Sequence, residues 1–235
     1  MALSEPHPLL SAPLRELKAR IAGTYDAIAP QYNAWTASHH PVRLHYLNDL
    51  LSRLPSATTG IHVLELGAGA GDPGTAMLAT LPGARIIAND ISASQLSLLK
   101  ERLAAEISEG KVQVQQGDMM NLTFGAGELD AVVALYSVSH LPREEQSELL
   151  RRMGTWVRSG GWLLVNFAGK EDKGSVGVGW LEGKESQNAM YWSSWSPAES
   201  GRLVEGAGFR IETAEIRESE GENAAFFWVL AQKLD

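Results

Sequence analysis

The sequence contains no cysteine in its 235 residues. Disulfides, thiolate metal ligands and cysteine nucleophiles are therefore excluded, and the composition fits a reducing, cytoplasmic compartment. The chain also lacks an excess of positive charge, because 20 Lys and Arg stand against 28 Asp and Glu, a formal net charge of -8. Such a surface does not attract a phosphate backbone or an anionic membrane, so we expect neither nucleic acid nor a membrane as a partner.

Long apolar runs are missing as well. Residues 1–11 show no basic region followed by an apolar stretch, and no run approaches the roughly eighteen apolar residues that a membrane span needs. We therefore expect neither export nor a membrane span and place the protein in the cytoplasm, while its oligomeric state stays open. A chain of this length commonly forms one α/β domain, which we expect over residues 1–235.

Apolar periodicity divides the chain into a helical start and an alternating remainder. Leu14, Leu17 and Ile21 recur at helical spacing up to Gly23. A second helical stripe follows at Leu44, Leu47, Leu51 and Leu54. Short apolar runs then predict strands over 61–66, 84–89, 111–115, 129–136 and 161–167. Between them, helices are predicted over 96–107, opened by a capping pair of Ser92 and Gln95, and over 149–156.

This alternation predicts a doubly wound, Rossmann-like α/β fold, because strands that are apolar on both faces need helices on both sides. The last two predicted strands, 209–216 and 224–231, are joined by a short turn at 218–223. They must pair antiparallel, since a parallel return needs a crossover of a dozen or more residues. Residues 168–195, rich in glycine and aromatic residues, interrupt the alternation and are interpreted as an insertion.

The strongest motif is the run Val-Leu-Glu-Leu-Gly-Ala-Gly-Ala-Gly-Asp-Pro-Gly, residues 63–74, in which a predicted strand enters a glycine-rich turn. Without Cβ atoms, Gly67, Gly69 and Gly71 let main-chain N–H groups approach a ligand at the carboxyl end of the strand. Asp90 ends the next predicted strand, where a carboxylate can accept hydrogen bonds from both ribose hydroxyls. The pattern therefore predicts a nucleotide-like ligand, although glycines alone can also serve only tight packing.

These motifs resemble those of the class I S-adenosylmethionine-dependent methyltransferases, over roughly residues 20–235. The resemblance implies that Glu65 helps to hold the methionine ammonium group through water and that the three glycines pass beside the amino acid moiety. Its other implied contacts are the ribose for Asp90, the adenine ring for Ile91, the adenine amine for Asp118 and Met119, and the methionine portion for Leu135. The expected cofactor is S-adenosylmethionine, and the expected reaction is methyl transfer to a small molecule.

Two alternatives compete with that interpretation. Gly69-x-Gly71-x-x-Gly74 also spells the dinucleotide motif of NAD-dependent oxidoreductases. Glu65 before the turn, Gly-Asp after the third predicted strand and the antiparallel finish count against it, and no tyrosine is followed four places later by the lysine that short-chain dehydrogenases need. The second alternative is a protein that binds the cofactor without methylating, such as a pericyclase-like catalyst, because a cofactor site does not fix the chemistry. Asp118 by itself could also simply cap a turn.

The residues expected on the acceptor side are aromatic. Tyr25, Ile28, Tyr32 and Trp35 form one helical stripe that resembles the segment closing over the cofactor in small-molecule methyltransferases, although core burial is the alternative. We accordingly expect residues 14–55 to form a helical lid and 168–195 an insertion beside the acceptor. An aromatic hydroxyl acceptor is preferred on this ground, with nitrogen and carbon acceptors left open.

His140 follows the fourth predicted strand and is a candidate general base, because imidazole titrates in the useful range. Tyr25 and Tyr32 are further candidate catalytic residues, and anchoring of a loop is the alternative role for His140. His39 and His40 are adjacent and point in different directions on any regular element, so no metal site is predicted.

Overall fold

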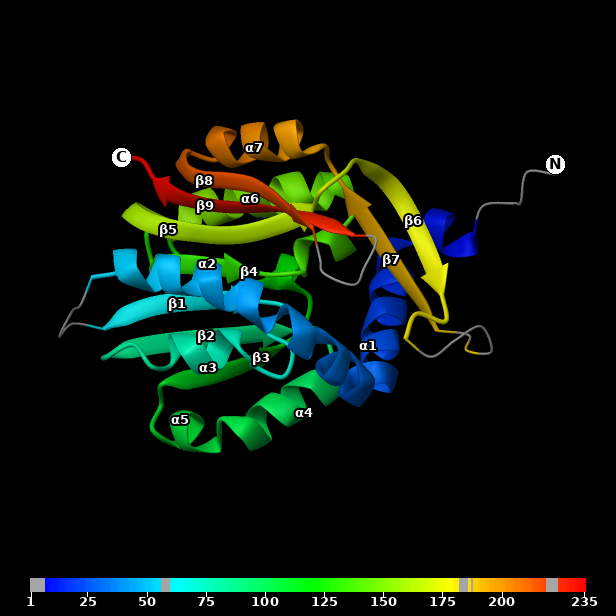
Figure 1. The fold of residues 1–235 in the computed structure, drawn as a ribbon, viewed down its shortest axis with the longest axis horizontal. Helices are drawn as coiled ribbons and strands as arrows, with labels where there is room; N and C mark the ends of the chain where they lie inside the picture. Colours follow the sequence, from blue (N-terminus) through cyan, green and yellow to red (C-terminus); the bar gives the residue numbers. More distant parts are fainter. Residues whose placement is uncertain (1–6, 56–59, 182–185, 187, 219–223) are drawn as a thin grey trace.

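A seven-stranded β-sheet forms the centre of the computed structural model, which describes residues 7–55, 60–181, 186, 188–218 and 224–235 (Figure 1). Its strand order is β3-β2-β1-β4-β5-β9-β8. The strands are β1 (Ile61–Leu66), β2 (Ala84–Asp90), β3 (Val112–Gln116), β4 (Leu129–Ala134), β5 (Val157–Ala168), β8 (Phe209–Glu218) and β9 (Ala225–Lys233). Strands β1 to β5 pair in parallel, whereas β9 runs antiparallel to β5 and β8. The predicted sheet with a reversed last strand is confirmed; its final turn lies, from residue 219 on, outside the described residues.

Helices cover both faces of this sheet. One face carries α2 (His40–Arg53), α3 (Gly74–Leu78), α4 (Ala93–Arg102) and α5 (Ala104–Ser108), and the other carries α6 (Arg143–Trp156) and α7 (Pro197–Gly206). Each face has its own apolar cluster, and β1 supplies both: Ile61 and Val63 belong to the first, Leu64 and Leu66 to the second. The two-residue period of a strand produces this division, which explains why the strand is apolar throughout.

The remaining elements lie at the carboxyl edge of the parallel strands (Figure 1). They are the helix α1 (Leu14–Thr36), preceded by a short 3-10 turn at Pro8–Ser11, and a hairpin of β6 (Asp172–Val178) and β7 (Ala189–Ser194) within the predicted insertion. Leu17 and Ile21 of α1 pack with Met190 of β7 in a third apolar cluster, and Thr24 Oγ1 donates a hydrogen bond of 2.9 Å to the carbonyl of Ala189. A helix and a hairpin therefore cover the edge where a ligand is expected.

The first helix is longer than its apolar pattern indicates. The stripe up to Gly23 predicts an end there, but α1 continues through Gly23 and Pro30 to Thr36. A helical glycine costs about 1 kcal/mol relative to alanine, and burial of Ile28 and Ala29 beyond it offsets that loss. No helix among the described residues combines the length and the hydropathy that crossing a bilayer requires.

The predicted buried face of α2 is partly wrong. Leu44 is exposed and Leu51 half-buried, whereas Tyr46 and Leu50 are buried with the correctly predicted Leu47 and Leu54. The cause is a tertiary contact, because the Tyr46 ring stacks on Trp228 of β9 with centroids 4.3 Å apart. This large aromatic pair turns the helix toward the tyrosine.

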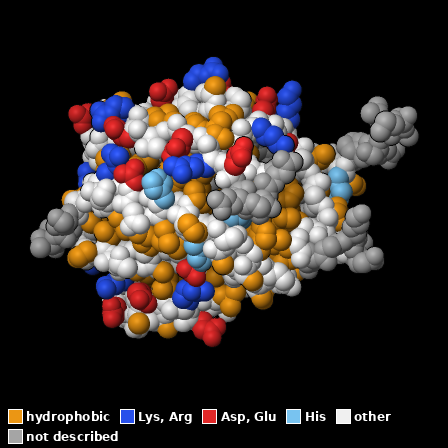
Figure 2. Space-filling model, viewed as in Figure 1, with side chains coloured by type: hydrophobic (Ala, Val, Ile, Leu, Met, Phe, Trp, Pro, Cys, Tyr) orange, Lys and Arg blue, Asp and Glu red, His pale blue; other side chains and the backbone are white. Residues whose placement is uncertain are grey.

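The surface seen in Figure 2 mixes charges of both signs. Acidic and basic side chains are interspersed on this face, and hydrophobic side chains form a band between its upper and lower charged regions (Figure 2).

Candidate active site

The glycine-rich turn leaves β1 with three glycines in left-handed backbone conformations. Gly67, Gly69 and Gly71 have φ values of 70, 57 and 77°. A Cβ on Gly67 would collide with Ser137, and one on Gly71 would lie 3.0 Å from Leu99 of α4, so these two glycines permit close packing. At Gly69 the nearest atom would be Gln95 Oε1 at 3.7 Å. Of the three, Gly69 is the one whose open side faces a cavity.

Asp90 ends β2 beside this turn. Its Oδ2 accepts the Gly69 N–H and its Oδ1 accepts the Ser92 N–H, each at 2.8 Å. Burial raises the pKa of the Asp90 carboxyl, and the backbone hydrogen bonds act in the opposite direction. The carboxylate is therefore fixed between the glycine turn and the start of α4, with acceptor capacity left for a ligand.

Gln95 is a site residue that the sequence does not reveal. Ser92 caps α4 as predicted, since its Oγ accepts the Gln95 N–H at 3.1 Å. The reciprocal half of the capping pair is absent, because the Ser92 N–H is taken by Asp90. The Gln95 amide is 1% exposed, and neither its oxygen nor its nitrogen has a hydrogen-bond partner among the described residues. Leaving a buried polar group unpaired costs about 1–3 kcal/mol, so this amide is suited to bind a polar ligand.

Glu65 lies buried at the end of β1, and Gly74 makes its position possible. Its Oε2 accepts a hydrogen bond of 2.5 Å from Thr75 Oγ1, and a Cβ on Gly74 would collide with its Oε1. Burial raises the pKa of Glu65 to about 7, opposed by the Thr75 hydrogen bond and by the positive charge of Arg43. A cation brought to this carboxyl would favour its ionised form.

Arg43 is the second site residue absent from the sequence predictions. It is buried in α2, and its guanidinium carbon lies 4.6 Å above the centre of the Tyr136 ring. Its charge lowers the pKa of both Glu65 and His39. A lone arginine on a helical stripe gives no sequence signal for this place near the glycine turn.

A cavity of about 70 Å³, called here the small cavity, brings together most of the predicted cofactor residues. It is lined by Gly67, Gly69, Asp90, Ile91, Met119 and Leu135, together with Gln95. Glu65, Gly71 and Asp118 are not among its lining residues. Asp118 accepts the Met120 N–H at 2.9 Å, which caps a 3-10 turn, and pairs with Lys18 Nζ at 2.7 Å. Its turn-capping alternative is thus present in the structure.

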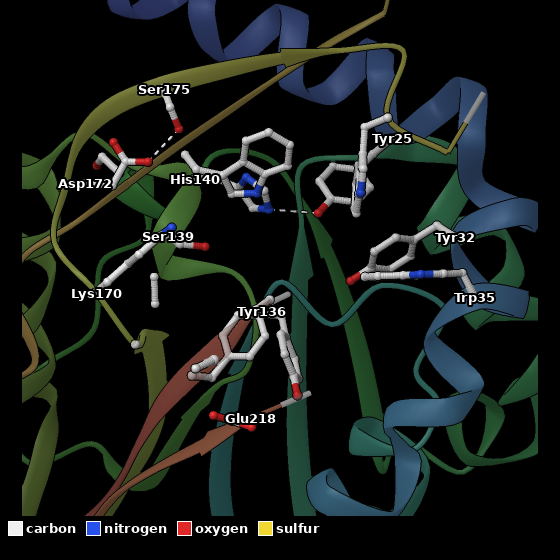
Figure 3. A pocket seen from close by; sticks show the side chains of 18 residues that line it. Tyr25, Tyr32, Trp35, Tyr136, Ser139, His140, Lys170, Asp172, Ser175 and Glu218 are labelled. Carbon is white, nitrogen blue, oxygen red and sulfur yellow. Dashed lines mark hydrogen bonds between the residues drawn. The ribbon is translucent and has the colours of Figure 1, made fainter. Parts of the chain in front are cut away.

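A second cavity of about 600 Å³, called the large cavity, lies beneath the β6–β7 hairpin. Four residues line both cavities: Tyr25, Tyr32, Tyr136 and His140. Figure 3 shows them around the large cavity, with His140 and Tyr25 facing each other across from Tyr136. Among the described residues, only these four line both cavities, and they are called here the shared wall.

The hydrogen bonds of His140 fix its tautomer. Its Nδ1 lies 2.9 Å from the Tyr191 carbonyl oxygen, which can only accept, so Nδ1 carries the hydrogen. The neutral ring then presents a bare Nε2, which accepts the hydroxyl hydrogen of Tyr25 at 2.8 Å. Burial lowers the pKa of His140 to about 4, and it raises the pKa of Tyr25 well above its ordinary value. At neutral pH the pair is an uncharged phenol donating to an uncharged imidazole.

Polar contacts attach α1 to the sheet edge at two points. Near its start, Lys18 Nζ lies 2.7 Å from Glu145 as well as from Asp118. Further along the helix, Asp26 accepts hydrogen bonds from Ser92 Oγ at 2.7 Å and from the Ser94 N–H at 2.9 Å. Both attachments are polar contacts whose partners water can replace.

Comparison with known proteins places the central part of the chain. A family model described as a methyltransferase domain matches residues 63–161, which include the glycine turn. Methyltransferase GfsG of Streptomyces halstedii is 32% identical over 108 residues, and magnesium-protoporphyrin O-methyltransferase of Rhodobacter capsulatus is 34% identical over 110 residues. These alignments cover 46% and 47% of this chain, but only 38% and 47% of the relatives. The chain thus spans less than half the length of these relatives.

The fold is similar to solved structures over nearly its whole length. The 1,6-didemethyltoxoflavin-N1-methyltransferase of Burkholderia thailandensis superposes with a TM-score of 0.69 at 17% identity, covering 100% of this chain and 98% of that one. The [4+2]-cyclase SpnF gives a TM-score of 0.67 at 14% identity, covering 92% and 97%. At such identities the likeness establishes the fold alone.

Proposed function

We propose that the chain is a class I S-adenosylmethionine-dependent methyltransferase and that it transfers a methyl group to a small molecule bound in the large cavity. One observation carries this proposal. The small cavity, where the family's cofactor residues gather, and the large cavity share the wall of Tyr25, Tyr32, Tyr136 and His140. A group that passes from one ligand to the other must pass at this wall.

The residues of the small cavity fit an adenosine. The carboxylate of Asp90 and the unpaired amide of Gln95 offer acceptors and donors to the ribose and its neighbours, and Gly69 lets the backbone approach. Ile91 and Met119 supply apolar surface for a flat ring. When bound, S-adenosylmethionine supplies a methyl group already activated on a positively charged sulfur.

Beside the glycine turn, Glu65 and Arg43 suit the two charges of the methionine end. An α-amino acid group carries an ammonium and a carboxylate, and this pair of buried side chains offers one charge of each sign. Because the pKa of Glu65 is raised to about 7, its carboxyl is only partly ionised at neutral pH, and an approaching cation favours the ionised form. We infer that Glu65 faces the ammonium, as the family resemblance implies, and that Arg43 favours the carboxylate.

The residues of the shared wall position the donor and the acceptor and accept the proton that the acceptor loses. Methyl transfer from a sulfonium is an in-line displacement, so the protein chiefly holds donor and acceptor in line and excludes water. Tyr32 and Tyr136 border the passage as fixed rings, and His140 Nε2, reached through Tyr25, receives the proton that the acceptor loses. Few further catalytic groups are needed.

Helix α1 is proposed to be a lid. Ile21, Tyr25 and Tyr32 close the small cavity from this helix. Its volume of about 70 Å³ has room for about two water molecules, so a nucleoside enters only when α1 moves outward. The polar attachments of Lys18 and Asp26 are the contacts that break in such a movement.

Isothermal titration calorimetry and a turnover assay test the proposed function. We expect S-adenosylmethionine and S-adenosylhomocysteine to bind with one-to-one stoichiometry and NAD not to bind. When S-adenosylmethionine and an acceptor are supplied, a methyltransferase forms both a methylated product and S-adenosylhomocysteine. The cyclase-like alternative would bind the cofactor without consuming it. Binding of NAD in place of the sulfonium compounds would contradict the proposal.

A further inference from the structure

The large cavity has an unusual lining for an apolar pocket. Its volume of about 600 Å³ falls in the range of about 300–1,000 Å³ that holds drug-sized ligands. Among the described residues that line it, no leucine, isoleucine, valine or methionine occurs; the apolar surface comes from aromatic rings, alanine and glycine. A lining of flat rings favours flat, conjugated ligands over branched or saturated ones, because rings pack face to edge or in offset stacks.

One side of the cavity is an interlocked group of rings from α1 and the hairpin. The Tyr32 ring lies 5.9 Å from Trp35 and 5.8 Å from Trp180, and Trp180 lies 5.4 Å from Trp35 and 5.6 Å from Trp192, all as distances between ring centroids. Most of these pairs meet edge to face, which leaves each ring fixed by its neighbours. This side therefore presents preformed ring surfaces.

Tyr136 provides a second fixed ring surface. Its backbone has a φ of 56°, which a non-glycine residue adopts only when its surroundings hold it there. Asn166 Oδ1 accepts the Tyr136 N–H at 2.6 Å, Phe226 packs edge-on at 4.6 Å between centroids, and Arg43 lies over the ring. In Figure 3, Tyr136 lies across the cavity from Tyr25 and His140. The cavity is thus bounded by rings on two sides.

The polar groups of the cavity occupy distinct places. Tyr25 and His140 form the proton-accepting pair at the shared wall. Ser139 and Lys170 lie on the side opposite Tyr32 and Trp35 (Figure 3). They offer donors toward that side of the cavity, which suits oxygen substituents of a ring. The carboxylate of Asp172 is already bound by Ser175 Oγ at 2.5 Å and by the Gly174 N–H at 2.9 Å, so it is less suited to recognise a cationic amine. The other carboxylate that lines the cavity, Glu218, lies beyond Tyr136 and away from Tyr25 and His140 (Figure 3).

We propose that the acceptor is a flat, fused-ring aromatic compound whose acidic hydroxyl group lies at Tyr25 and His140 and whose other oxygen substituents face Ser139 and Lys170. This inference rests on the proposed function, whose acceptor it identifies by class. An aromatic hydroxyl suits an uncharged imidazole base better than an alkyl hydroxyl, because it is far more acidic; the phenol of tyrosine has a pKa of about 10.

The group transfer balances with the residues present. The acceptor oxygen forms its new bond to the methyl carbon as the carbon–sulfur bond of the donor breaks. The hydroxyl proton passes to Tyr25 Oη while Tyr25 gives its own proton to His140 Nε2. The positive charge that the donor sulfur loses therefore ends on the imidazole, which releases the proton to solvent.

Binding of three probes to the full chain saturated with S-adenosylhomocysteine tests the proposed class. The probes are alizarin, a flat fused-ring hydroxyl compound with carbonyl groups, decahydro-2-naphthol, a saturated fused-ring alcohol, and 2-naphthylmethylamine, a cationic amine. We expect alizarin to bind at least about tenfold more tightly than the other two, measured by calorimetry and by quenching of tryptophan fluorescence. With S-adenosylmethionine instead, mass spectrometry should find an alizarin methyl ether.

Substitutions of the ring surfaces provide the matched comparison. Trp180→Leu and Trp192→Leu keep an apolar side chain but remove a flat face, so each should weaken alizarin binding by about three- to tenfold. Trp195→Leu is the control, because this ring packs on Arg143 outside the cavity. Equal affinity for the saturated alcohol or the amine, or unchanged alizarin binding in both variants, overturns the proposal and leaves the proposed function intact. Failure to bind S-adenosylhomocysteine contradicts the proposed function itself.

Discussion

Two buried titratable groups at the shared edge of the sheet respond to pH in opposite directions. The folded pKa of Glu65 is raised to about 7, so its contribution to stability is fully present below pH 4.5 and is lost as pH rises through 7. The folded pKa of His140 is lowered to about 4 from 6.5, so the unfolded chain takes up a proton first and stability is lost as pH falls between these values. Between pH 4.5 and 6.5 the two effects oppose each other.

Glu65→Gln should stabilise the unliganded protein at alkaline pH. The amide keeps an acceptor for Thr75 but cannot ionise, so at pH 8 the free energy of unfolding should rise by about 2–3 kcal/mol, with a much smaller change at pH 5. Urea denaturation at both pH values measures this difference. The same variant should bind S-adenosylhomocysteine more weakly, because it lacks a charge for the ammonium. A stability change that is equal at pH 5 and pH 8 would show that ionisation of Glu65 is not its cause.

Asp90→Ala should weaken binding of S-adenosylhomocysteine by about 1–3 kcal/mol, because two ribose hydroxyls lose their acceptor. The substitution also frees the Gly69 and Ser92 N–H groups, so a loss of stability accompanies it. Calorimetry at a temperature where the variant is folded measures the affinity. Asp49→Ala, which removes an exposed carboxylate paired with Arg53, is the control and should bind like the original protein. An unchanged affinity in folded Asp90→Ala would place the ribose elsewhere.

At the scale of elements, the N-terminal helix and the hairpin cover the candidate site, so we expect them to control the entry of ligands. Helix α1 packs on β7 through a small apolar cluster, on α4 beside the buried Ile28 and Ala29, and on the sheet edge through Lys18 and Asp26. This is a modest attachment compared with the two large clusters that hold the sheet and its helices. Elements with few apolar contacts open at low free-energy cost, as a lid requires.

Hydrogen exchange should slow across Tyr25–Trp35 when S-adenosylhomocysteine is added, because a ligand beneath α1 opposes its opening. Lys18→Met removes both ion pairs of the helix start and should speed exchange in the unliganded protein. Lys111→Met, which removes an exposed pair with Glu109, is the matched control and should leave α1 unchanged. Identical exchange with and without ligand would contradict the lid and leave the aromatic stripe as ordinary packing.

Helices and strands were predictable from the sequence where the apolar pattern was compatible with only one buried arrangement. The strand at 61–66 is apolar on both faces, which predicts a strand buried on both sides, and the structure buries both faces. The buried face of α2 was not predictable from the sequence, because two overlapping apolar stripes of this helix share Leu47 and Leu54. Only the stacking of Tyr46 on Trp228 determines which stripe is buried. The hairpin also gave no clear signal, since β6 is rich in glycine and pairs only with β7.

The site followed the same rule. The sequence places Gly69 and Asp90 together because a strand end followed by glycine, and an acid at the next strand end, meet at one sheet edge, and the structure brings both to the small cavity. The sequence did not predict Gln95 as a site residue because the capping pair with Ser92 explains its position locally. In the folded chain Asp90 accepts the Ser92 N–H, which leaves the Gln95 side-chain amide unpaired. Arg43 escaped because only tertiary packing brings its helix over Tyr136.

At the scale of the whole molecule, the candidate site residues gather at one edge of the sheet. The carboxyl ends of β1, β2 and β4 supply Glu65, Asp90 and the segment carrying Tyr136 and His140, while α1 and the hairpin enclose that edge (Figures 1 and 3). Open α/β sheets bind ligands at this edge because the loops that leave neighbouring parallel strands there diverge. The two cavities meet at the shared wall, and we propose that the methyl group crosses there.

A crystal structure of the chain bound to S-adenosylhomocysteine would decide whether the methyl group crosses at this wall. We expect the adenosine beside Gly69, Asp90 and Gln95, with the sulfur facing the shared wall and the large cavity beyond it. A ligand bound elsewhere, or a sulfur turned away from Tyr25, Tyr32, Tyr136 and His140, would contradict it.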